Sequence, residues 1–304
     1  MAPTVAQRGY LAFLDATVEP FRPLGVMRNS GVDLAAILRI VALFEAAYWA
    51  FRLGVRGYQR RRGGTKGKAD EDMLWFGGSY VVTLVMSAFV AVRGTALFML
   101  LLTLAAPKGV TTFGVLSEVQ DPEEADFFAR AMAHATYTNE VFLAYLVYDI
   151  MHMAYQFKGY YRTDMALHHA GFLFCSTFCQ SYSAMVFAFS WLIQGEYSTV
   201  FLELRWLLRK AGVTGNAAFA VDMGFLGSFF FSRVVLYGYG LAKLVYECYF
   251  DGVPNPEPEY PMALHHVVVS VVTACWFLNL SWFQGIIKVV KRSFFSKDKS
   301  AKAA

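Results

Sequence analysis

Charged residues are scarce in this chain. Only 16% of its 304 residues are charged, whereas 57% are hydrophobic and 17% are aromatic. Soluble domains carry about 25% charged and roughly 45–50% apolar residues, so this shortage of charge indicates a surface that faces hydrocarbon. The length allows one compact membrane domain without a large soluble partner domain. The sequence therefore predicts an all-α integral membrane protein.

Cysteine and proline are also few. The four cysteines lie in or beside apolar runs and form no CxxC pair or Cys/His ladder. This pattern is unlike a zinc module or a secreted disulfide framework. Nine prolines and no proline- or serine-rich tract argue against a long disordered linker. A cleavable signal peptide is not expected, because acidic residues and prolines interrupt the stretch from Tyr10 to Met27.

Apolar segments long enough to cross a bilayer recur along the chain. About 20 residues span the hydrocarbon core as a helix. Seven spans are expected, at residues 32–53, 74–93, 135–157, 165–178, 182–207, 218–246 and 263–289. Residues 95–105 form the end of the second span, a separate short helix or a re-entrant segment.

The charges of the connecting segments predict the orientation. Basic residues follow the first, third, fifth and seventh spans, whereas the loops after the second and sixth spans are acidic. Lys and Arg favour the cytoplasmic side, so the N-terminus is expected in the lumen and the C-terminus in the cytoplasm. The short basic loops offer no folded surface for nucleic acid.

Four regions follow from this reading. Residues 1–31 are expected outside the membrane, and residues 32–73 hold the first span with its basic cytoplasmic loop. Residues 74–292 form the main membrane domain, and residues 293–304 form a basic cytoplasmic tail.

Several ionisable residues fall inside the expected spans, where each costs a few kcal/mol unless it has a partner or a wet cavity. The third span holds Tyr148, Asp149 and His152. Asp149 and His152 are three residues apart, hence on one face and close enough to pair, either to handle a proton or to hold two helices together. His168 and His169 open the fourth span, and they point about 100° apart on a helix. One can face a cavity while the other faces a neighbouring helix or a lipid headgroup.

The fifth span carries Glu196 and Glu203, seven residues apart and therefore on one helical face. They can orient a histidine or bind a polar headgroup, or they can pair with Arg205 or Lys210. No regular histidine spacing supports a metal site, so neither a metal nor a cofactor is predicted.

The last two spans hold further polar residues. Asp222 and Arg233 are eleven residues apart and should share a face. A deep arginine usually holds a carboxylate or a phosphate. In the seventh span, His265 and Asn279 are fourteen residues apart and again share a face with Trp276.

These residues together resemble the TLC-domain family, the lipid-handling membrane domain of ceramide synthases and translocating-chain-associated proteins. The resemblance covers residues 74–292. It is carried by Tyr148–Asp149, Leu167-His168-His169, Glu196-x-Ser198-Thr199, Leu204-Arg205-Trp206 and Phe230-x-x-Arg233.

The resemblance implies a barrel-like bundle of six helices in the endoplasmic reticulum or the Golgi, with a central cavity for a long acyl chain. In ceramide synthases the paired histidines work with a motif of the form His-Asp-x-x-Asp. The corresponding stretch here reads Gly195-Glu196-Tyr197-Ser198, and the next acid is Glu203. The pattern is more similar to the small TLC-domain-containing branch, whose members are linked to membrane lipid composition.

Three functions are consistent with these patterns. The first is a membrane protein that binds or senses a lipid and contributes to lipid homeostasis. The second is an N-acyltransferase that uses long-chain acyl-CoA, with His168, His169, Glu196 and Glu203 as candidate catalytic residues. The third is a lipid transporter or cargo receptor, suggested by the repeat of Met-Ala-Leu-His-His at 165–169 and 262–266. The candidate lipid-binding residues are Tyr148, Asp149, His152, Arg233, His265 and Asn279.

Overall fold

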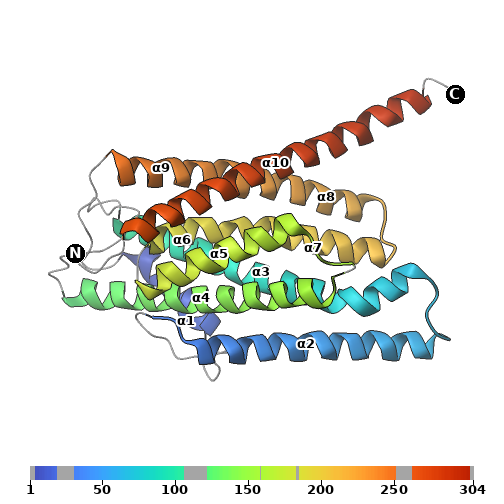
Figure 1. Ribbon diagram of the computed structural model, residues 1–304, viewed down its shortest axis with the longest axis horizontal. Helices are drawn as coiled ribbons and strands as arrows, with labels where there is room; N and C mark the ends of the chain where they lie inside the picture. Colours follow the sequence, from blue (N-terminus) through green and yellow to red (C-terminus); the bar gives the residue numbers. More distant parts are fainter. Residues whose placement is uncertain are drawn as a thin grey trace.

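The protein folds into a bundle of long helices (Figure 1). The computed structural model describes residues 4–18, 31–105, 122–157, 159–182, 185–250 and 262–301. These residues contain no β-strand, which confirms the all-α prediction. The α-helices are α1 (Val5–Val18), α2 (Leu34–Arg61), α3 (Lys68–Ala105), α4 (Pro122–Tyr155), α5 (Thr163–Ser181), α6 (Val186–Leu192), α7 (Glu196–Lys210), α8 (Asn216–Ser228), α9 (Tyr237–Tyr249) and α10 (Met262–Ala301).

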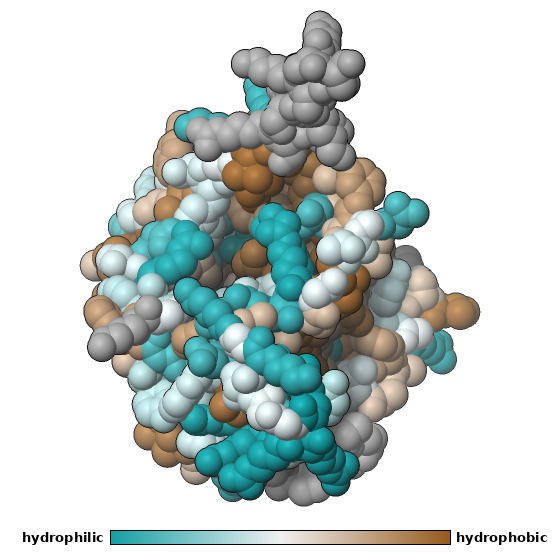
Figure 2. Space-filling view, turned by 90° about the vertical axis from the view of Figure 1, so that its right-hand side faces the viewer, coloured by the Kyte–Doolittle hydropathy of each residue, from teal (hydrophilic) through white to brown (hydrophobic). Residues whose placement is uncertain are grey.

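Successive long helices run in opposite directions, so the end of α2, the start of α5 and the end of α7 lie at one end of the bundle (Figure 1). That end, which we call the basic end, holds Arg60 and Arg61 of α2, Arg162 before α5, and Arg209 and Lys210 of α7. Figure 2 looks onto this end, where hydrophilic residues cover much of the face. The expected acidic loop positions 118–121 and 251–259 lie outside the described residues.

Four helical stretches are long and apolar enough to cross a membrane, namely Leu34–Arg61, Lys68–Thr103, Asn216–Tyr249 and Met262–Lys291. The protein is thus an integral membrane protein. Helices α4, α5 and α7 do not meet this criterion within the described residues. They carry many buried polar groups, among them Glu140, Asp149, His168, His169 and Glu203, which lower their hydropathy.

Two expected spans contain irregular turns. The fifth is divided by a 3₁₀ turn (Ile193–Gly195) between α6 and α7, and the sixth contains a π-helical stretch (Phe229–Leu236) between α8 and α9. Such turns inside a helix often mark functional positions. The second span is a single helix, because α3 continues without a break through residues 95–105.

Helix α1 was not predicted, because Asp15 and nearby residues interrupt its apolar pattern. Leu11, Leu14 and Val18 are nevertheless buried against α3 and α4. Arg93 of α3 is also completely buried, and its guanidinium donates to the Leu14 carbonyl oxygen at 3.0 Å. Asp15 lies 2.9 Å from His134 Nε2 of α4. These polar contacts offset the cost of burying the arginine and attach α1 to the bundle.

Candidate functional site

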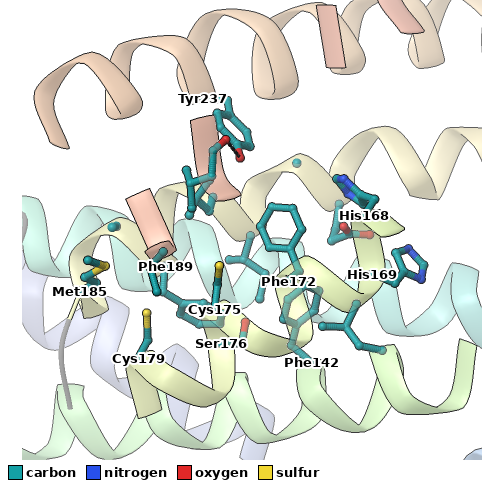
Figure 3. A pocket seen from close by; sticks show the side chains of 18 of the residues that line it. Phe142, His168, His169, Phe172, Cys175, Ser176, Cys179, Met185, Phe189 and Tyr237 are labelled. Carbon is teal, nitrogen blue, oxygen red and sulfur yellow. Dashed lines mark hydrogen bonds between the residues drawn. The ribbon is translucent and has the colours of Figure 1, made fainter. Parts of the chain in front are cut away.

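A narrow cavity runs inside the bundle along α5 (Figure 3). The α5 residues that line it recur every three to four positions, so they occupy one face of the helix. Side chains of α4, α6, α7, α9, α10 and the π-helical stretch close the other sides. The α5 positions are His168, His169, Phe172, Cys175, Ser176 and Cys179.

The two ends of this cavity differ in chemistry. His168, His169, Glu196 and Arg233 line one end, which we call the polar end. Cys179, Met185, Phe189 and Leu244 belong to the apolar remainder. Figure 3 shows the two histidines at one side, and Cys179, Met185 and Phe189 at the other. From His168 to Cys179 the helix rises about 16 Å, so the cavity suits an elongated amphiphile.

Arg233 is fixed by four neighbours at the polar end. Its Nε donates to the Gly195 carbonyl oxygen at 3.1 Å and to Ser198 Oγ at 2.7 Å. Its Nη2 donates to Thr199 Oγ1 at 3.0 Å and lies 3.3 Å from Glu196 Oε1. The arginine thus holds a carboxylate, as the sequence predicts. Its planar, permanently charged group is locked in one orientation.

His168 is buried and lies beside this arginine, with Nε2 3.5 Å from Arg233 Nη1. A guanidinium can only donate, so Nε2 accepts and the proton of the neutral ring sits on Nδ1. Nδ1 has no hydrogen-bond partner among the described residues. The polar end therefore keeps a spare N–H donor next to a cation, which suits a carbonyl, carboxylate or phosphate oxygen.

His169 forms a buried pair with Asp149 of α4. Its Nδ1 lies 2.9 Å from Asp149 Oδ2, and Asp149 Oδ1 accepts from the Tyr160 hydroxyl at 2.7 Å. This contact lacks hydrogen-bond geometry, and Nδ1 has no hydrogen-bond partner among the described residues. A proton on Nδ1 would face the carboxylate, which would leave Nε2 as the nitrogen that can accept a proton. A histidine oriented by a carboxylate is the usual arrangement of a general base.

The predicted pairing of Asp149 with His152 is wrong. His152 Nε2 lies 2.8 Å from Glu45 Oε1, and its Nδ1 lies 3.0 Å from Ser79 Oγ. Side chains three positions apart still diverge by about 60° around a helix, so Asp149 faces α5 while His152 faces α2 and α3. The Tyr148 ring packs on His152 at 4.2 Å. Tyr148 and His152 thus belong to a helix interface and do not line the cavity.

Glu203 is buried behind the polar end. Its Oε2 has no hydrogen-bond partner among the described residues, and Asp149 and Glu196 are close enough to interact with it electrostatically. Glu203 does not line the cavity.

The alternative role of the two glutamates, an ion pair with Arg205 or Lys210, does not agree with the observed contacts. Arg205 Nε lies 2.6 Å from Asp222 Oδ1, and Lys210 contacts Asp72 instead. Asp222 and Arg233, which were expected to share a face, both bond to residues of α7.

His265 and Asn279 of α10 lie outside the cavity lining. His265 Nε2 lies 3.3 Å from Cys248 Sγ, near the start of α10 and away from the basic end. Asn279 is completely buried, and neither of its amide atoms has a hydrogen-bond partner among the described residues. Neither residue joins the polar end of the cavity.

The sequence analysis missed Tyr160, which lies between two expected spans, and the aromatic wall formed by Phe142, Phe172 and Phe189. The spacing from His168 could have identified Phe172, since it repeats the face of the histidine four residues later. Within the part of the chain that the structure describes, no group of three or more metal-ligating side chains is assembled.

Comparison with known protein families matches residues 110–288 to the TLC domain. No curated protein and no solved structure matches the chain. The matched residues include α4 to α9 and most of α10, and thus every helix that lines the cavity. The match covers more than half of the sequence, so the chain belongs to the TLC-domain family.

Proposed function

We propose that this protein binds the acyl chain of a membrane lipid in the cavity along α5, and that it senses or adjusts membrane lipid composition through this binding. The observation that carries the proposal is the division of one buried cavity into a polar end and an apolar remainder. Arg233 and His168 supply hydrogen-bond donors for the headgroup oxygens. Apolar side chains next to Cys179 and Phe189 accommodate the hydrocarbon.

We infer that the chain crosses the membrane seven times, with α6 and α7 as one crossing and α8 to α9 as another, and that residues 74–292 form a barrel-like TLC domain. The alternating helix directions support this count. The gathering of basic residues at one end supports a cytoplasmic C-terminus and a lumenal N-terminus. Family membership favours the endoplasmic reticulum. The polar end of the cavity then lies nearer the cytoplasm, because His168 is five residues into α5.

Filling the cavity should remove the bound lipid. In α10, Val268 lines the cavity and is 1% exposed, whereas its neighbour Val267 faces outward and is 45% exposed. Val268→Phe should abolish most lipid retention, because the added ring occupies the space of the chain. Val267→Phe makes the same substitution on the outer face and should leave retention unchanged. Native mass spectrometry of each purified variant measures the co-purified lipid.

Equal lipid retention by the two valine variants would contradict the proposal. So would a wild-type protein that carries no lipid above a blank of the same detergent. Thermal unfolding of both variants checks whether Val268→Phe still folds. Lipid loss supports the proposal only if Val268→Phe unfolds at about the same temperature as Val267→Phe.

A second candidate function is N-acyl transfer, and the Asp149–His169 pair favours it. In such a reaction His169 Nε2 removes a proton from the amine of an acceptor, and the amine attacks the thioester carbonyl of acyl-CoA. A C–N bond forms, the C–S bond breaks, and the proton passes from the histidine to the leaving thiolate. The N–H donors of Arg233 and His168 are suited to the negative charge that develops on the carbonyl oxygen.

A further inference from the structure

A second, smaller cavity adjoins the apolar part of the first. It lies between α4, α5 and α6. Two residues, Cys179 and Phe189, line both cavities, so their side chains form the partition between them. The residues that line only the second cavity are Met132, Ala135, Thr136, Asn139, Gln180 and Val186.

The aromatic ring of Phe189 forms most of this partition. Its side chain is buried, and its ring packs against Phe142 of α4 with the centroids 6.2 Å apart. Cys179 from α5 contributes only a small thiol. The Phe189 backbone amide donates to the Met185 carbonyl oxygen at 2.8 Å, which holds the backbone of Phe189 in the first turn of α6. Truncation of this one ring would join the two cavities.

The second cavity suits the end of a hydrocarbon chain. Met132, Ala135 and Val186 give it apolar walls. Its amide groups bond mainly to neighbouring helices, because Asn139 Nδ2 donates to the Ser176 carbonyl oxygen at 2.9 Å and to Gln180 Oε1 at 2.6 Å. No charged side chain lines it. A chain that starts at the polar end and follows α5 reaches the partition about 16 Å later.

We propose that Phe189 sets the upper length of the acyl chain that the protein holds, and that the second cavity is an extension of the binding site. The proposal rests on the proposed function and adds a chain-length specificity to it. A lipid whose chain ends before the ring fits entirely in the first cavity. The Phe189 ring blocks the end of a longer chain, so the last methylenes of that chain stay outside the cavity.

Phe189→Ala should shift the retained lipids towards longer chains. Each methylene that enters the joined cavity should raise retention about fourfold, as expected from the transfer free energy of one buried methylene. The probe is the membrane lipid of the expression host, co-purified with each variant. Solvent extraction followed by mass spectrometry measures the acyl-chain lengths against a blank of the same detergent.

Two controls isolate the partition. Phe142→Ala removes a ring that lines only the first cavity, so it should widen the site without lengthening the retained chains. In the background of Phe189→Ala, Val186→Phe should fill the second cavity and restore the wild-type lengths. Phe189→Leu keeps most of the buried volume, and it should give a smaller shift in the same direction if the alanine variant fails to fold.

The outcomes separate this inference from the proposed function. Unchanged chain lengths in a folded Phe189→Ala or Phe189→Leu variant that still carries lipid would overturn the partition role alone. Lengthening in Phe142→Ala to the same extent would also overturn it. A wild-type protein without lipid above the blank would overturn the proposed function, and the inference would fall with it.

Discussion

Replacing Arg233 with alanine should lower the free energy of unfolding by about 3–5 kcal/mol, because it leaves the buried Glu196 carboxylate without its cation. The two side chains are only 10% and 12% exposed. The change also deprives the Gly195 carbonyl oxygen, Ser198 and Thr199 of a donor. Chemical or thermal unfolding in detergent measures the loss.

Arg205→Ala is the matched control for this prediction. Its ion pair with Asp222 is half-exposed, with side chains 28% and 34% accessible. Such pairs contribute about 0–1 kcal/mol, so this variant should unfold almost like the wild type. Equal destabilisation by the two substitutions would contradict the role assigned to Arg233.

Lysine at position 233 separates charge from geometry. Arg233→Lys retains a cation beside Glu196 but cannot contact Gly195, Ser198 and Thr199 at once, since it lacks the planar fork. We expect Arg233→Lys to recover part of the unfolding free energy that Arg233→Ala loses, and to retain less lipid than the wild type. Full recovery of both would mean that only the charge at position 233 matters.

His169→Gln should lower the rate of acyl transfer by about 10²–10⁴-fold if the protein is an acyltransferase, which is the range for loss of a general base. Asp149→Asn should also lower it, because an amide no longer favours the tautomer that leaves Nε2 free. The assay incubates purified protein with long-chain acyl-CoA and a sphingoid base, and mass spectrometry quantifies the ceramide that forms.

His266→Gln is the control for this assay. His266 occupies the same position as His169 within the repeated Met-Ala-Leu-His-His sequence, but it is exposed and bonds to Tyr249 outside the cavity. Its replacement should leave the rate unchanged. No ceramide from the wild type would exclude this acyl transfer while leaving lipid binding untouched. Full activity of His169→Gln would rule out its role as the base.

The helical part of the architecture could be predicted from the sequence because each long apolar segment has to form a helix in lipid. The histidines, Glu196 and Arg233 were also identified, since ionisable groups in apolar segments stand out. The residues that these side chains contact could not be predicted. Helical spacing gives the direction of a side chain within its own helix, whereas Asp149 meets His169 through the packing of α4 on α5.

Helix α1 could not be predicted, because the local sequence does not show the partners of Asp15. Asp15 interrupts the apolar pattern and indicates a segment exposed to water. In the structure, however, this carboxylate bonds to His134 and Arg130 of α4, and Leu14 is buried next to Arg93. A charge whose partner lies more than one hundred residues away has no local signature.

The π-helical stretch from Phe229 to Leu236 bears on how relatives of this chain should be aligned. Hydrogen bonds from i to i+5 accommodate an additional residue in a turn, and each residue of a helix accounts for about 100° of rotation. A relative that is α-helical throughout this crossing would therefore need one residue fewer between Ser228 and Tyr237 to present the same faces to α7 and α10. A one-residue gap at this place would mark the presence or absence of the wide turn rather than an alignment error.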